Sequence, residues 1–274
     1  MRKFSSLDTR GCATTDGGFC VPPLATSLLI FACIFGSSVL AMAIGRKLKP
    51  HHISTESRDV VKLGIGMVSA MSALILSLIV SSVMSSYNQT ERDVQQYAAD
   101  IANLDASLRD HGPEADSIRA TMRQFTQMAI EGAWPTLHAK DNQAGPTVVG
   151  HRLTAIGVSI SDLSSATAEE QRTKLASLQA FNKVHQDYWK IAVETYSSVN
   201  PTLVTILTVW LTLIFVSFGL FAPRNLITYA FLFACSASIA CAVYIILDLN
   251  APFEGLMSIR STPLENALSR LQQP

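Results

Sequence analysis

Two long uncharged stretches near the C-terminus constrain this chain more than any other feature. Residues 202–222 and 225–247 contain no Asp, Glu, Lys, Arg or His, and only Pro223 and Arg224 separate them. At about 1.5 Å of rise per residue, each stretch is long enough as an α-helix to cross the roughly 30 Å hydrocarbon core of a membrane. So short a connection predicts a tight helical hairpin within the membrane.

Two further uncharged stretches, 24–44 and 63–86, occur in the N-terminal third. The composition also indicates a membrane protein, because only 15% of the residues are charged, whereas about 25% is usual for a soluble domain. The small-x-small sequence Ala41-Met42-Ala43 is also typical of a signal-peptide cleavage site, but the apolar region before it is too long for a signal peptide. The sequence therefore predicts an all-α membrane protein with four transmembrane helices arranged as two hairpins.

The second span is expected to leave the membrane without a break in the helix. Apolar residues keep three- and four-residue spacing over 94–108, and Asp93, Asp100 and Asp105 lie off that face. Pro113 and the glycine before it are expected to end the helix. The pattern predicts one long helix that enters a water-soluble bundle.

More helices are expected between the second and third spans. Thr167 followed by Glu170 has the form of a capping box, in which each side chain binds the backbone N–H of the other residue. Residues 87–201 are therefore expected to form a helical extramembrane bundle. The remaining segments are a mobile tail over 1–23 and a C-terminal tail over 248–274.

One face of the second span is made of small residues. They recur at three- and four-residue steps, which places them on one side of a helix: Gly66, Ala70, Ala73, Ser77 and Ser81. Small residues let helices approach closely in lipid, so this face can be a helix-packing surface. Serine hydroxyls can also line a pore, since they offer dipoles to an ion without a fixed charge. The sequence leaves both interpretations open.

The distribution of Lys and Arg predicts the orientation in the membrane. The linkers 45–62 and 222–225 must lie on the same side of the membrane. Together they contain as many Lys and Arg residues as the membrane-proximal segments on the opposite side, although those segments are more than three times as long. The denser side is expected to face the cytoplasm. The bundle and both termini are then expected outside the cell membrane, in the periplasm of a bacterium that has one.

No arrangement of residues typical of an enzyme is found. The chain has no Gly-rich phosphate loop, no Gly-x-Ser-x-Gly elbow and no pair of histidines with the spacing of a zinc site on a helix. His51-His52 could ligate a metal, but the lysines of the same short linker favour a cationic, lipid-facing surface instead. A formal net charge of zero gives no basic bias towards nucleic acid. We expect no catalytic activity, no cofactor and no metal.

The exit of the fourth span carries a resemblance to a known family. Asp248 is followed by Pro252, Phe253 and Gly255, after a membrane hairpin that closes a long helical insertion. Further matching residues are Trp210, Phe215, Pro223-Arg224 and Pro263-Leu264. Over residues 60–270 the chain resembles the bacterial bestrophin-like domain family, a membrane family of unknown function.

The resemblance implies a multi-pass protein of the bacterial cytoplasmic membrane. The more distant bestrophins are pentameric anion-permeable channels whose second span lines the pore, which implies a homo-oligomer and small ions as partners. In bestrophins an acidic run that holds calcium follows the exit motif, whereas here only Glu254 and Glu265 are nearby. The helical insertion of bestrophins is cytosolic, which is opposite to the orientation that the charges predict.

Two functions of different classes remain. The first is an oligomeric ion channel or channel-like pore, with Ser77 and Ser81 facing the conduit. The second is a membrane-anchored sensing or scaffolding protein whose bundle binds a partner. A pore predicts several copies of the small-residue face around one axis, whereas a scaffold predicts that this face is buried against other spans of the same chain.

Overall fold

The computed structural model describes residues 13–14, 20–21, 23–45, 55–134, 146–194, 201–223, 225–253 and 255–272. His51, His52, Arg224, Glu254, most of the N-terminal tail and the stretch 135–145 lie outside the described residues. The described part is helical apart from two short strands, β1 (Ala13–Thr14) and β2 (Cys20–Val21), which pair antiparallel with Ala13 opposite Val21.

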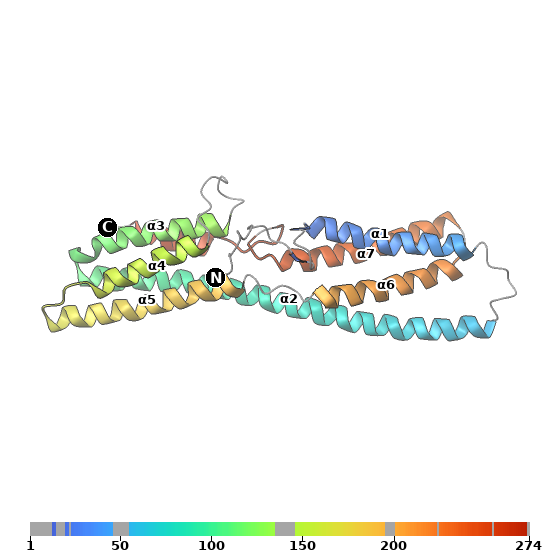
Figure 1. The fold of residues 1–274 in the computed structure, drawn as a ribbon, viewed down its shortest axis with the longest axis horizontal. Helices are drawn as coiled ribbons and strands as arrows, with labels where there is room; N and C mark the ends of the chain where they lie inside the picture. Colours follow the sequence, from blue (N-terminus) through green and yellow to red (C-terminus); the bar gives the residue numbers. More distant parts are fainter. Residues whose placement is uncertain are drawn as a thin grey trace, which may run out of the picture. The chain divides into compact units, whose positions relative to one another are not determined.

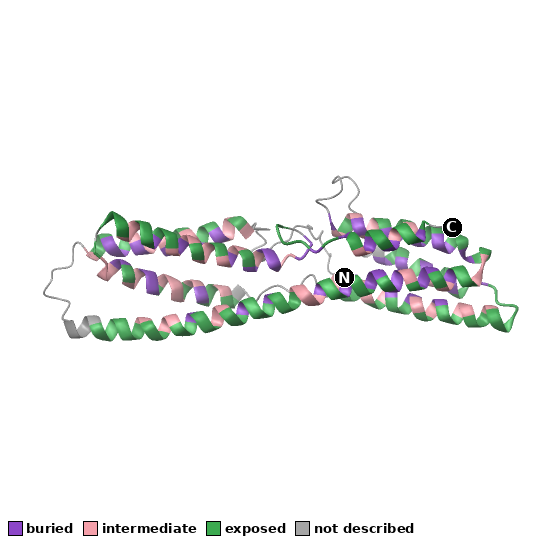
Figure 2. Ribbon diagram, turned by 180° about the vertical axis from the view of Figure 1, so that it is seen from behind, coloured by how far each residue is buried: buried purple, intermediate pink, exposed green. Residues whose placement is uncertain are grey.

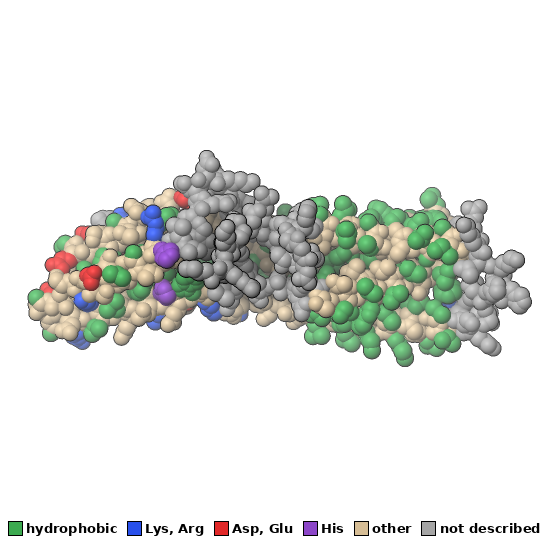
Figure 3. Space-filling model, viewed as in Figure 1, with side chains coloured by type: hydrophobic (Ala, Val, Ile, Leu, Met, Phe, Trp, Pro, Cys, Tyr) green, Lys and Arg blue, Asp and Glu red, His purple; other side chains and the backbone are tan. Residues whose placement is uncertain are grey.

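The chain divides into two compact units, here called the apolar unit and the polar unit. The apolar unit comprises Met1–Ser85 and Ser198–Asn250, and the polar unit comprises Ser86–Ser197 and Ala251–Pro274. Hydrophobic side chains dominate the visible face of the apolar unit, and charged side chains gather on that of the polar unit (Figure 3).

Among the described residues, four helices are long and apolar enough to cross a membrane. They are α1 (Pro23–Gly45), α2 (Thr55–His111), α6 (Pro201–Phe221) and α7 (Leu226–Leu249) (Figure 1). The uncharged stretches 24–44 and 63–86 fall within α1 and α2. The stretches 202–222 and 225–247 coincide with α6 and α7, except that residues 222 and 225 lie just outside the helices. As expected, α2 continues unbroken past its apolar part, but it also begins at Thr55, several residues before the stretch 63–86.

Within the apolar unit, α1 packs against both α6 and α7. Phe31 and Phe35 of α1 meet the edge of Phe233 of α7, with ring centroids 5.4 and 5.6 Å apart. The contact with α6 is closer, because a Cβ at Gly219 would lie 2.1 Å from the backbone oxygen of Ser38. Ser38 is fully buried, and its hydroxyl donates to the backbone oxygen of Phe35 at 2.8 Å, so no polar group of that side chain is left for lipid.

Helix α2 ends where the sequence predicts. Gly112 has a φ of 102°, a conformation that favours glycine, and α2 stops directly before it. A short 3-10 turn, η2 (Pro113–Ala115), leads into α3 (Asp116–Ala133). The remaining helices are α4 (Pro146–Ser161), α5 (Ala168–Glu194) and α8 (Thr262–Leu271).

The predicted capping box at the start of α5 is confirmed. The backbone N–H of Glu170 donates to Thr167 Oγ1 at 3.2 Å, and Glu170 Oε2 accepts from the N–H of Thr167 at 3.1 Å. These backbone hydrogen bonds lower the pKa of Glu170.

The core of the polar unit includes the expected apolar face of α2. Val94, Tyr97, Ile101, Leu104 and Leu108 are all at most 3% exposed. One expectation is wrong. Asp93, Asp100 and Asp105 were predicted to lie off the buried face, yet they are 9%, 3% and 4% exposed. The buried surface of α2 is wider than its apolar stripe because helices pack against it on both sides of that stripe.

Candidate functional site

The small-residue face of α2 is turned away from the rest of its own chain. Gly66, Ala70, Ala73, Ser77 and Ser81 are all exposed, and a Cβ added at Gly66 would meet nothing within 4 Å. By contrast, Ser72, Ile79 and Val83 are 4%, 5% and 6% exposed. At about 100° per residue these two sets lie on opposite sides of the helix. The described spans therefore cover the Ser72 side of α2 and leave the small residues uncovered.

The serines of the two faces also differ in their hydrogen bonds. The Ser72 hydroxyl donates to the backbone oxygen of Val68 at 2.8 Å. Among the described residues, the hydroxyls of Ser77 and Ser81 make no hydrogen bond. They can therefore offer their oxygens to a ligand, to water or to another chain.

A row of large apolar side chains runs beside the small-residue face. Met67, Met71, Leu74 and Leu78 are 71%, 57%, 66% and 70% exposed. Figure 2 shows the corresponding part of α2 as mostly exposed. The uncovered surface of α2 thus has two stripes, one shallow with hydroxyls and one bulky and fully apolar.

The exit motif is a turn that returns the chain to the polar unit. Asp248 lies in the last turn of α7 and is 3% exposed. Gly255 has a φ of 94°, which side chains disfavour. The backbone oxygen of Pro252 accepts from the N–H of Ile259 at 2.7 Å, which closes the turn. The turn accounts for Pro252 and Gly255 without a ligand.

Trp134, at the end of α3, receives this turn. Its ring meets the edge of Phe253 at a centroid distance of 5.0 Å, and its Nε1 donates to the backbone oxygen of Ile259 at 2.7 Å. The sequence contains no signal for this contact, because 125 residues separate Trp134 from Ile259. In the polar unit, Phe253 therefore anchors the C-terminal segment, and α8 packs on α3 beyond it.

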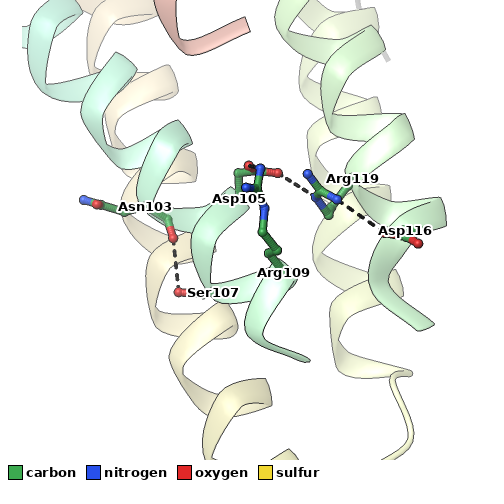
Figure 4. A network of polar contacts seen from close by, with 6 residues as sticks. All are labelled: Asn103, Asp105, Ser107, Arg109, Asp116 and Arg119. Carbon is green, nitrogen blue, oxygen red and sulfur yellow. Dashed lines mark hydrogen bonds and ion pairs between the residues drawn. The ribbon is translucent and has the colours of Figure 1, made fainter. Parts of the chain in front are cut away.

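A buried ion pair joins α2 to α3 (Figure 4). Arg119 Nε donates to Asp105 Oδ1 at 2.8 Å, and the two side chains are 8% and 5% exposed. Asp116 also pairs with Arg119, at 3.3 Å. Arg109 also pairs with Asp105, at 3.1 Å. The hydrogen bond with Asp105 raises the pKa of Arg119, so the guanidinium stays charged despite its burial.

A second polar layer joins α2 to α5. Lys190 Nζ donates to Asp93 Oδ1 at 2.7 Å. Burial, followed by the interaction with Asp100 one heptad further along α2, raises the pKa of Asp187 on α5. Sequence reasoning missed the ion pairs that join the helices in both layers, since each pair forms between two different helices. Asp105 and Arg119 are 14 residues apart in the chain, and Asp93 and Lys190 are 97 residues apart. Within the described ranges, no three His, Cys, Asp or Glu side chains are grouped closely enough to hold a metal ion.

Comparison with known proteins gives a family and a fold. The family model described as a Bestrophin-like domain matches residues 32–264. A tryptophan-to-alanine variant of a bacterial bestrophin homologue from Klebsiella pneumoniae has a similar structure, with a TM-score of 0.68, 13% identity, and coverage of 92% of this chain and 98% of the other.

Two further solved structures are similar. A tyrosine-to-alanine variant of the Klebsiella pneumoniae homologue has a TM-score of 0.66 at 13% identity, over 90% of this chain and 97% of the other. A structure described only as a membrane protein, with one proline replaced by alanine, has a TM-score of 0.63 at 14% identity, over 91% and 100% of the two chains. No curated protein sequence matches this chain.

Proposed function

Because this chain belongs to the Bestrophin-like domain family, we propose that it is a membrane protein whose copies assemble into an ion channel or channel-like pore lined by α2. The observation that carries the proposal is the uncovered small-residue face of α2, which lies opposite the face that packs on its own chain. The proposal assigns no catalytic reaction to the protein.

The two faces of α2 suit a helix that lines a pore. In a ring of identical copies, the helix nearest the axis turns its packed face outward to its own chain and its opposite face to the axis. On α2 the packed face contains Ser72 and Ile79, and the opposite face contains Ser77 and Ser81. Hydroxyl oxygens replace part of the hydration shell of an ion, while small side chains keep the bore open.

The apolar stripe of Met67, Met71, Leu74 and Leu78 supports assembly into a homo-oligomer. These side chains flank the small residues, so in a ring they face the neighbouring copy or the lipid. Van der Waals packing between the side chains of neighbouring helices drives helix association in membranes. The fold shared with bacterial bestrophin homologues agrees with this arrangement.

We further propose that the polar unit is an extramembrane bundle inserted between the second and third spans. The part of α2 that belongs to the polar unit contains Glu91, Arg92 and Asp93, and charged side chains of this kind are excluded from the hydrocarbon core. The Lys and Arg of linkers 45–62 and 222–225 support a cytoplasmic position for those linkers and a periplasmic position for the bundle, in a bacterial inner membrane.

Cysteine labelling tests this orientation. In a variant without the native cysteines, Asn182→Cys places a thiol on the exposed side of α5. We expect a membrane-impermeant maleimide to label it in intact spheroplasts, since the bundle is proposed to face the periplasm. A cysteine at Thr55 is the matched control and is expected to react only after lysis. Labelling in the reverse pattern would place the bundle in the cytoplasm.

Ion flux through liposomes tests the pore. The double variant Ser77→Leu, Ser81→Leu is expected to reduce flux at least tenfold, because two leucines narrow the bore and make it apolar enough to dewet. Purified protein is reconstituted and the flux of small anions and cations is measured with an ion-sensitive dye.

Ser238→Leu is the matched control for this experiment. It makes the same substitution at an exposed serine of α7 and is expected to leave flux unchanged. If liposomes with a high load of the wild-type protein show no ion flux, the channel proposal is wrong and the membrane-anchored scaffold is favoured. Equal flux from the wild type and the double variant would show that the small-residue face does not line the conduit.

A further inference from the structure

We propose that the turn after the fourth span docks on the lipid surface, with Leu256 and Met257 inserted at the boundary between headgroups and acyl chains. This turn, here called the exit turn, comprises residues 252–259. The contact lies outside the four membrane-spanning helices. It stands whether or not the protein conducts ions and whichever side of the membrane the polar unit faces.

The first support is the exposure of two large apolar side chains at the tip of the exit turn. Leu256 is 81% exposed and Met257 is 50% exposed. Among the described large hydrophobic residues, only Leu226 and Ile227, at the start of the membrane helix α7, are exposed as much as Leu256. Apolar surface of this size is unfavourable in water. The tip therefore has an exposure that the described chain otherwise shows only on a membrane span.

The second support is that the fold anchors the exit turn on both sides of its tip. Phe253 and Ile259 are 8% and 4% exposed. Trp134 contacts both, because its ring meets the edge of Phe253 at 5.0 Å and its Nε1 donates to the backbone oxygen of Ile259 at 2.7 Å. The turn is thus ordered before it meets a partner, so docking loses little conformational entropy.

The third support is the position of the exit turn in the chain, which selects lipid as the partner. Leu256 follows Leu249, the last residue of α7, by seven residues. Even a fully extended chain, at about 3.6 Å per residue, would keep Leu256 within about 25 Å of the end of this membrane helix. The actual path is shorter, since bends and turns occupy most of it. The tip therefore lies within reach of the lipid surface from which α7 emerges.

A cation beside the tip favours the same partner. Arg260 directly follows Ile259 and is the one charged residue among the described positions of 250–262. It is exposed, and it forms no ion pair within the described part of the chain. Apolar side chains next to a cation are typical of segments that dock on membranes, because the apolar groups enter the acyl boundary and the cation binds headgroup phosphates.

Fluorescence quenching of the full-length protein in liposomes tests the contact. In a variant without the native cysteines, Leu256→Cys carries a fluorophore, and the vesicles contain phosphatidylcholine and phosphatidylglycerol. Lipids with a nitroxide near the carboxyl end of the acyl chain are expected to quench it about threefold more than the same fluorophore at Leu175→Cys, since an inserted tip lies at that depth. Iodide, which stays in water, is expected to quench the two positions in the opposite order.

Leu175 is the matched control, because it is also an apolar residue of the polar unit, is 55% exposed, and lies in the first third of α5, far along that helix from the third span. Quenching of Leu256→Cys by iodide alone would place the tip in water, and quenching by neither agent would mean that protein, such as a second copy, covers it. Either result overturns the proposal, as does equal nitroxide quenching at both positions. If Leu256→Cys does not fold, Met257→Cys decides by the same outcomes.

Discussion

Alanine at Gly219 is expected to separate α1 from α6. The new Cβ would lie 2.1 Å from the backbone oxygen of Ser38, well inside van der Waals contact. A backbone atom of a buried helix has no rotamer by which to move aside, so the helices themselves must shift. Overpacking of this kind destabilises by about 1–3 kcal/mol, and we expect the upper end of that range here. Unfolding of the purified protein by titration with a denaturing detergent measures the loss.

Gly36→Ala on α1 is the control for this prediction. A Cβ at Gly36 meets nothing within 4 Å, and alanine is the better helix former by about 1 kcal/mol. The control is therefore expected to be neutral or slightly stabilising. If Gly219→Ala were as stable as Gly36→Ala, the close contact of α1 with α6 would have no energetic role.

Methionine at Arg119 is expected to destabilise the polar unit by about 3 kcal/mol. The change leaves Asp105, whose side chain is 5% exposed, without its shorter ion pair. Removing one partner of a buried pair costs about 3–5 kcal/mol, because the remaining charge has no water to solvate it. Arg109 still binds Asp105 at 3.1 Å, which places the effect at the lower end. Thermal unfolding in detergent, followed by circular dichroism, measures the change.

A second substitution separates the charge from the packing. In the double variant Asp105→Leu, Arg119→Met no charge is left buried, and most of the lost stability is expected to return. Lys62→Met removes a partner of an ion pair whose side chains are 67% and 71% exposed, and it is expected to have no measurable effect. Failure of the double variant to recover would mean that Arg119 contributes through packing rather than charge.

Much of the fold could be predicted because its causes are local. Each membrane-length helix contains one long uncharged stretch, since a charge in hydrocarbon is costly wherever the chain places it. The end of α2 follows from Gly112 and Pro113, and the start of α5 follows from Thr167 and Glu170. These signals act within four residues, so no knowledge of distant partners is needed to interpret them.

The site could be predicted only in part. The spacing of Gly66, Ala70, Ala73, Ser77 and Ser81 shows that they share a face, since the helical period alone decides it. Which side of α2 packs on its own chain depends on the other spans, and periodicity does not contain that information. The contact of Trp134 with Phe253 was likewise out of reach, because the two residues belong to segments that meet only after folding.

The sequence by itself determined the number of apolar spans, the continuity of α2 and the family to which the chain belongs. Tertiary structure alone decided which charged residues are buried. Asp93, Asp100 and Asp105 look solvent-exposed on an isolated helix, yet all three are buried, and α3 and α5 bring Arg119 to Asp105 and Lys190 to Asp93. The physical reason is that burial of a charge depends on its partners, and these partners come from other helices.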